Sequence, residues 1–144
     1  MAAQDKIHDA VKNAPIKDGW TITADPYSIA YKGLGLSADL AAERTLAAER
    51  GVERIVVEIK SFLGPSLVYD FQQALGQYEM YRFYLSLTEP DRVLFLAIGN
   101  NTYVQFFQRE AVQALTAETK IKLVIVDLEI EEVVQWIGQP SIGN

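Results

Sequence analysis

The pattern of apolar and polar positions predicts three helices in this chain. Apolar residues recur at helical spacing over residues 5–18, so we expect a helix there with Asp5 as its N-cap. Pro15 should kink this helix or end it early, because proline lacks a backbone donor. A longer helix is predicted from Leu67 to Leu87, where apolar residues recur every three or four positions, and an amphipathic helix should begin near Asn101.

Alternation of period two and short apolar runs predict strands between these helices. Two Ala-Ala-Glu-Arg segments in residues 41–50 favour a helix by local propensity. We nevertheless expect an extended hairpin there, with its turn at Arg50-Gly51, because the chain must fold back before the next strand. The order of elements predicts an α/β fold with a mixed central β-sheet flanked by helices, in one domain over residues 1–144. The predicted strands cover Trp20 to Thr23, Tyr27 to Tyr31, Leu34 to Leu40, Arg54 to Lys60, Val93 to Ile98 and Ile121 to Val126, with a short terminal element over Glu131 to Ile137.

The composition of the chain limits the kinds of catalytic and metal-binding site that it can form. The chain has no cysteine, which excludes disulfides, thiol catalysis and zinc-thiolate sites, and its one histidine, His8, cannot form a multi-histidine metal site. Any metal must therefore be held by oxygen ligands. The formal charge of −6 opposes strong independent DNA binding, although a local basic groove or bound cations can offset it. No signal peptide and no apolar run of about 20 residues is present, so we expect a soluble, cytoplasmic protein.

Glu58 and Lys60 are unusual charges within an apolar strand. Strand side chains alternate between faces, so both should project to one side while Ile55, Val57 and Ile59 cover the other. Burying charge is costly, so this pair indicates either an edge strand or a functional site. An incidental surface ion pair explains the Glu-x-Lys tripeptide alone equally well.

Asp39 supplies a second carboxylate upstream of this strand. Two carboxylates and a backbone carbonyl suit Mg²⁺ or Mn²⁺, and we expect Asp39, Glu58 and the Ile59 carbonyl to hold the ion. The metal would polarise a phosphodiester and activate water, while Lys60 would orient that water or offset negative charge. These residues predict metal-dependent phosphodiester hydrolysis.

The sequence also resembles known families. Asp39, Glu58-Ile59-Lys60 and the helix containing Gln77 and Tyr81 are similar to the PD-(D/E)XK restriction-endonuclease-like superfamily, although Ala38 stands where the motif has proline. More specifically, the chain resembles the XisH family, the fdxN element excision controlling factors of cyanobacteria, over nearly its whole length. The segments that carry this resemblance are residues 8–14, 16–20, 47–51, 56–64, 74–78 and 90–92.

The resemblance implies a restriction-endonuclease-like fold and a role in programmed DNA excision, with a site-specific recombinase and a companion factor, XisI, as partners. It assigns catalytic roles to Asp39, Glu58, Lys60 and Gln77. Two functions stay open: a metal-dependent DNA endonuclease, and a noncatalytic DNA- or protein-binding regulator that retains the nuclease fold. Homo-oligomerisation is open as well.

Three further side chains have less specific signals. An ordinary surface position is the more frequent explanation for His8, because it has no obvious ligand partner in the sequence. Gln77 and Tyr81 lie on one side of the long helix, where lining a site and packing on the sheet explain them equally well.

Overall fold

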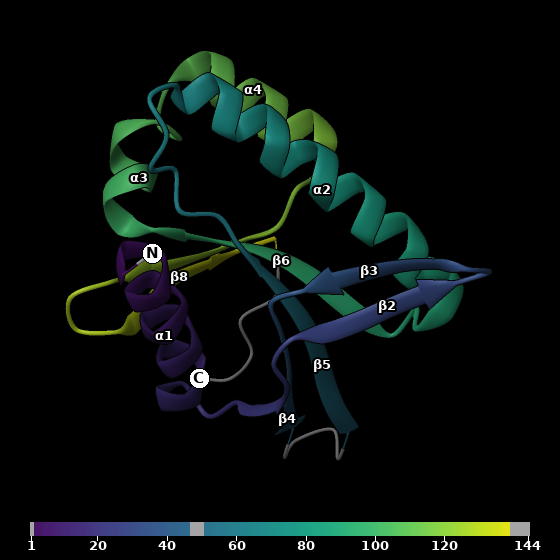
Figure 1. Ribbon diagram of the computed structural model, residues 1–144. Helices are drawn as coiled ribbons and strands as arrows, with labels where there is room; N and C mark the ends of the chain where they lie inside the picture. Colours follow the sequence, from purple (N-terminus) through teal and green to yellow (C-terminus); the bar gives the residue numbers. More distant parts are fainter. Residues whose placement is uncertain (1, 47–50, 139–144) are drawn as a thin grey trace.

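The computed structural model describes residues 2–46 and 51–138 (Figure 1). No helix in these ranges combines the length and apolar character needed to cross a membrane. The helices are α1 (Ala2–Lys17), α2 (Leu67–Thr88), α3 (Asn100–Gln105) and α4 (Glu110–Thr119). The strands are β1 (Thr21–Ala24), β2 (Tyr27–Tyr31), β3 (Leu34–Ala38), β4 (Leu40–Leu46), β5 (Gly51–Ile59), β6 (Arg92–Gly99), β7 (Leu123–Asp127) and β8 (Glu132–Ile137).

Six strands form one mixed sheet in the order β1-β4-β5-β6-β7-β8. β4 pairs antiparallel with β5, while β5, β6 and β7 run parallel, and β8 returns antiparallel to β7. α2 makes the long crossover that the parallel pair β5 and β6 requires. β2 and β3 form a separate hairpin. The predicted α/β architecture, a mixed sheet flanked by helices, is confirmed.

The two faces of the sheet carry separate cores. Ile55 and Val57 pack with Val11 of α1 on one face, and Val56 packs with Phe71 of α2 on the other. Figure 1 shows this arrangement, with α1 on one side of the sheet and α2 and α4 on the opposite side. The predicted alternation of β5 is therefore correct, and even-numbered β5 residues face α2.

The predicted start of α1 is wrong, and Pro15 does not end the helix early. The helix begins at Ala2 rather than at an Asp5 N-cap, and it continues past Pro15 to Lys17. Pro15 lies in the last turn, so few backbone bonds depend on its missing donor. Its carbonyl accepts hydrogen bonds from the N–H groups of Asp18 and Trp20, at 2.9 and 3.0 Å, and these bonds close the helix end.

The helix predicted near Asn101 is two helices, α3 and α4. Between them lie Phe106 and Phe107, which are both buried. Adjacent residues of a helix point about 100° apart. A break in the helix lets both rings pack against Phe62 and Phe71, with ring centroids 5.4 to 6.0 Å apart.

The segment predicted as extended over residues 41–50 is extended in its described part. β4 pairs with β5 from Leu40 opposite Val57 to Leu46 opposite Gly51. The predicted turn residue Arg50 lies outside the described residues. The run predicted from Leu34 to Leu40 is divided at Asp39, where the chain leaves the β2–β3 hairpin and enters the main sheet.

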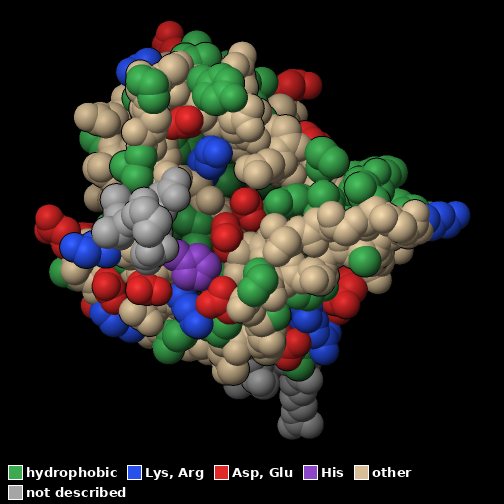
Figure 2. All heavy atoms as spheres, viewed as in Figure 1, with side chains coloured by type: hydrophobic (Ala, Val, Ile, Leu, Met, Phe, Trp, Pro, Cys, Tyr) green, Lys and Arg blue, Asp and Glu red, His purple; other side chains and the backbone are tan. Residues whose placement is uncertain are grey.

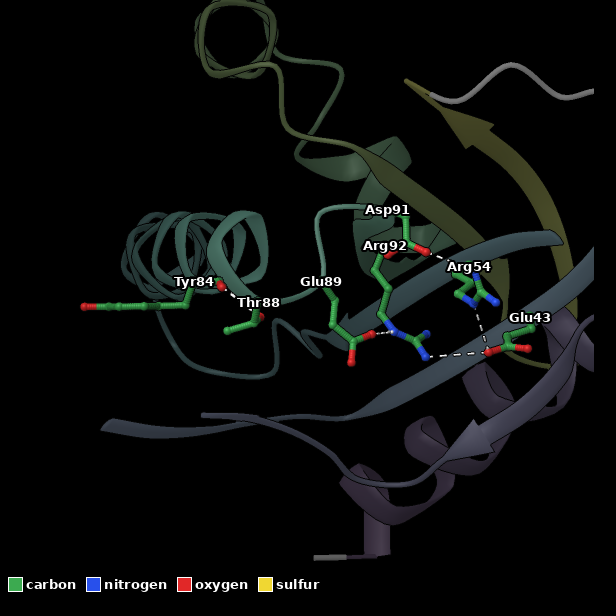
Figure 3. A network of polar contacts seen from close by, with 7 residues as sticks. All are labelled: Glu43, Arg54, Tyr84, Thr88, Glu89, Asp91 and Arg92. Atoms are coloured by element: carbon green, nitrogen blue, oxygen red, sulfur yellow. Dashed lines mark hydrogen bonds and ion pairs between the residues drawn. The ribbon is translucent and has the colours of Figure 1, made fainter. Parts of the chain in front are cut away.

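Ion pairs fix the end of the sheet at which β6 begins (Figure 3). Arg54 of β5 binds Glu43 of β4 at 3.3 Å and Asp91 at 2.9 Å. Arg92 binds Glu89 at 2.6 Å and approaches the same Glu43 carboxylate at 3.6 Å. These pairs tie β4, β5 and β6 together at the end of the sheet opposite Glu58.

Candidate functional site

Sheet register brings Asp39 and Glu58 together. Leu40 pairs with Val57 in the antiparallel ladder, so the preceding residue, Asp39, lies opposite Glu58. The Ile59 N–H donates a 2.8 Å hydrogen bond to Asp39 Oδ2, which fixes that carboxylate at the end of β5. The two carboxylates predicted from the sequence therefore meet where β5, β6 and β7 end, at Ile59, Gly99 and Asp127. We call this the carboxyl end of the sheet.

Glu58 is a buried charge in a central strand. Its exposed fraction is 8%, and β5 lies between β4 and β6, so the edge-strand explanation does not apply. Its Oε1 atom is buried and has no hydrogen-bond partner within the described part of the chain. An unpaired buried carboxylate oxygen is costly, which indicates a missing partner such as a proton or a cation.

The surroundings raise the pKa of Glu58 to about 8. Burial is the largest cause, because it penalises the ionised carboxylate, and the negative charge of Asp39 adds to it. The positive charge of Lys60 opposes both effects. Glu58 therefore keeps a proton at neutral pH unless a cation replaces it.

Ile59 and Lys60 follow Glu58 directly in the chain, whereas Gln77 lies on α2. Lys60 follows β5 and is half-buried, close enough for its charge to act on Glu58. Ile59 contributes its N–H, while the ligand role of its carbonyl oxygen stays a prediction. Gln77 is half-buried on α2, and no hydrogen bond joins it to Asp39 or Glu58 in the residues that the structure describes.

Tyr81 lies close to the two carboxylates. It is buried on α2, and its hydroxyl donates a 3.1 Å hydrogen bond to the Ser37 carbonyl, two residues before Asp39. Burial raises the pKa of Tyr81 to about 12, and the charges of Glu58 and Asp39 contribute. Tyr81 packs in the core and lies within reach of the charges of Glu58 and Asp39, while its role in lining a site stays a prediction.

The chain is held tightly just after Lys60. Phe62 has a left-handed backbone, with φ of 54°, which is uncommon for a residue other than glycine. Its buried ring contacts Phe106 and Phe107, with ring centroids 6.0 and 5.6 Å away. The Lys60 N–H also bonds to the Ala97 carbonyl of β6 at 3.0 Å. These contacts fix the direction in which the chain leaves β5.

His8 does not stand alone on α1. Its Nε2 atom lies 3.1 Å from Asp25 Oδ1, and Lys12 Nζ binds Asp25 Oδ2 at 2.8 Å. Figure 2 shows the histidine near the centre of the viewed face, in a hollow beside acidic side chains. Asp25 was not identified from the sequence, and its position directly after a short strand was the available signal.

The donor set fits a divalent cation held mainly by water. The structure describes no cluster of three or more histidine, cysteine, aspartate or glutamate side chains able to hold a metal. Magnesium commonly uses one or two carboxylates and keeps several waters, so Asp39 and Glu58 are sufficient. The unpartnered Glu58 Oε1 is where such an ion would supply the missing contact.

Comparisons with known proteins agree with this architecture. The family model described as XisH protein matches residues 1–134. The crystal structure of an XisH family protein from Nostoc punctiforme PCC 73102 is similar, with 44% identity, a TM-score of 0.83, and coverage of 92% of this chain and 98% of that chain. The crystal structure of an fdxN element excision controlling factor protein from Anabaena variabilis has 42% identity, a TM-score of 0.84 and the same two coverages of 92% and 98%. No curated protein matches the chain.

Proposed function

The chain belongs to the XisH family, and from this membership we propose that it is a controlling factor for programmed DNA element excision with a metal-dependent DNA endonuclease site. We further propose that its fold is restriction-endonuclease-like and that it acts in the cytoplasm. The observation that carries the proposal is the pairing of Asp39 with Glu58, which is buried beside Lys60 and has one carboxylate oxygen without a hydrogen-bond partner among the described residues.

Each residue has a chemical task in this function. Asp39 and Glu58, with the Ile59 carbonyl, would hold Mg²⁺ or Mn²⁺. When bound, such an ion polarises a phosphodiester and lowers the pKa of a water molecule. Lys60 places a positive charge beside the carboxylates, where it orients water and offsets the charge that develops on the phosphate. The Ile59 N–H holds the Asp39 carboxylate in place without neutralising it.

We propose that a site-specific recombinase and the companion factor XisI are partners of the protein. The formal charge of −6 gives the whole chain no net attraction for DNA. A site-specific recombinase and the companion factor XisI would supply positive surface and target selection. The protein would then act on DNA that its partners already hold.

The net negative charge also supports a second candidate function. In this alternative the protein is a noncatalytic regulator that keeps the nuclease fold and controls the recombinase by assembling with it. The net negative charge favours this candidate, because assembly with a protein does not require phosphate neutralisation.

A cleavage assay separates the two functions. Duplex and branched DNA would be incubated with the protein, alone and with the companion factor, in Mg²⁺ or Mn²⁺. The variants are Glu58→Gln and Lys60→Ala, with Glu132→Gln as a matched control, because Glu132 is an exposed carboxylate on β8. The endonuclease proposal expects cleavage that both site variants abolish and the control retains. Wild-type protein that cleaves no DNA under any condition, or cleavage unchanged in both site variants, would refute it.

A further inference from the structure

Asp25 holds His8 in one orientation. The Asp25 carboxylate lies 3.1 Å from His8 Nε2 through one oxygen and 2.8 Å from Lys12 Nζ through the other. The three side chains are 26 to 36% exposed, so they are ordered by each other while solvent still reaches them. A histidine placed by a carboxylate has a defined direction for its second ring nitrogen.

This cluster lies at the carboxyl end of the sheet. β1 pairs antiparallel with β4, with Ala24 opposite Ala41, so Asp25 lies beside the start of β4. Asp39 directly precedes that start, and it lies opposite Glu58 of the next strand. Figure 2 shows the histidine beside acidic side chains on the viewed face.

The hydrogen bond decides which ring nitrogen is available. The Lys12 hydrogen bond is the largest cause that lowers the pKa of Asp25, and His8 lowers it further, so Asp25 is an anion that only accepts hydrogen bonds. Nε2 of His8 must then carry a proton in both charge states of the ring. The neutral ring has its lone pair on Nδ1, which is the nitrogen left to act on a ligand.

We propose that His8 is a further catalytic residue of this site, with Asp25 as its positioning residue. This inference rests on the proposed endonuclease function and identifies the proton acceptor for it. The oxygen of the attacking water forms a bond to phosphorus as its proton passes to Nδ1 of His8. The bond from phosphorus to the leaving ester oxygen breaks, and that oxygen keeps the electron pair and takes a proton from solvent.

Charged side chains of opposite sign surround the histidine that would accept the proton. Asp25 stabilises the imidazolium that forms, as a carboxylate partner does for a catalytic histidine. Lys12 neutralises Asp25 on its other oxygen. Asp39, directly before β4, and Glu58 and Lys60, at the end of β5, are the other charged residues of the proposed site. An ordinary surface histidine would not need a carboxylate to orient it. Experiment can therefore distinguish a catalytic His8 from an ordinary surface histidine.

The test compares cleavage by the full chain with the variants His8→Ala and Asp25→Asn. Asp9→Asn is the matched control, because Asp9 is an exposed carboxylate next to His8 on the same helix. We expect His8→Ala to lower kcat by on the order of 100-fold with little change in KM, and added imidazole to restore part of the rate. Asp25→Asn should lower kcat by less, and Asp9→Asn should leave it unchanged.

Nitrogen NMR gives a second measurement, because the chain has one histidine and its signals need no further assignment. The wild type should show the neutral ring protonated at Nε2, and Asp25→Asn should reduce that preference. Cleavage by His8→Ala at the wild-type rate, or an Nδ1-protonated neutral ring, would overturn the inference while the endonuclease function stands. Loss of cleavage in Glu58→Gln shows that the function itself holds in the same assay, whereas no wild-type cleavage overturns both.

Discussion

At the scale of single residues, Glu58 makes the folding stability of the chain depend on pH when no cation is bound. Burial and the charge of Asp39 raise its pKa from 4.5 to about 8. Between these values the folded chain keeps a proton that the unfolded chain has released. Folding stability therefore falls as the pH rises through this window, and it is unaffected below it.

We expect Glu58→Gln to remove this pH dependence, because glutamine has the same shape and no charge. The free energy of unfolding of the variant, relative to wild type, should rise by on the order of 3 kcal/mol between about pH 5 and about pH 7.5 in a metal chelator. Urea unfolding at several pH values measures it, with Glu132→Gln as the control that follows the wild-type curve. Parallel curves for wild type and Glu58→Gln would contradict the raised pKa.

Residue types and strand alternation were enough to predict part of the candidate site. Glu58 and Lys60 were predictable because charged residues inside an apolar strand are costly to bury. Asp39 was predictable because a pair of carboxylates suits a metal with oxygen ligands. Asp25 was not predictable, because its position depends on the pairing of β1 with β4. The sequence named Tyr81 but left its role open, because its position depends on a hydrogen bond to the Ser37 carbonyl. Those contacts exist only after the chain has folded.

At the scale of elements, patterns of apolar spacing predicted α2 and β5 closely, since both have strong periodicity. The division of α3 from α4 was not predictable from local spacing, because it depends on burying Phe106 and Phe107 against rings from other elements. Propensity alone would have assigned a helix to the segment that forms β4. Pairing with β5 outweighed that preference.

The helix α2, which contains Tyr81, is capped at its first turn by the side chain of Ser66. Ser66 Oγ accepts a 3.1 Å hydrogen bond from the Tyr69 N–H. Ser66→Ala should lower the free energy of unfolding by about 1 kcal/mol, because the helix start loses this partner. Urea unfolding measures the loss, and Ser28→Ala, at an exposed position of β2, should change stability much less. Equal effects of the two variants would show that the cap contributes nothing.

At the scale of the whole molecule, most arginines in the described part of the chain are committed to internal ion pairs. The Arg44 guanidinium binds Glu53 at 2.8 Å, and Arg54 and Arg92 join the network at the opposite end of the sheet from Glu58. Arg82 is paired with Glu79 on α2. Such pairs reduce the number of arginines available to DNA phosphates, whose neutralisation drives nucleic-acid binding. A cation at Asp39 and Glu58 would change the charge that DNA meets at the carboxyl end of the sheet.

DNA affinity should therefore depend on divalent cations rather than on the protein's own basic residues. Calcium, which occupies oxygen sites without the strict geometry of magnesium, should tighten binding of a labelled duplex by at least about tenfold relative to chelator, measured by fluorescence anisotropy. The ion replaces the proton on Glu58 with two positive charges, so Glu58→Gln should lose most of this gain while Glu132→Gln keeps it. A calcium effect of equal size in both variants would place the responsible cation elsewhere, and tight binding in chelator would show that the acidic chain has a basic surface sufficient for DNA.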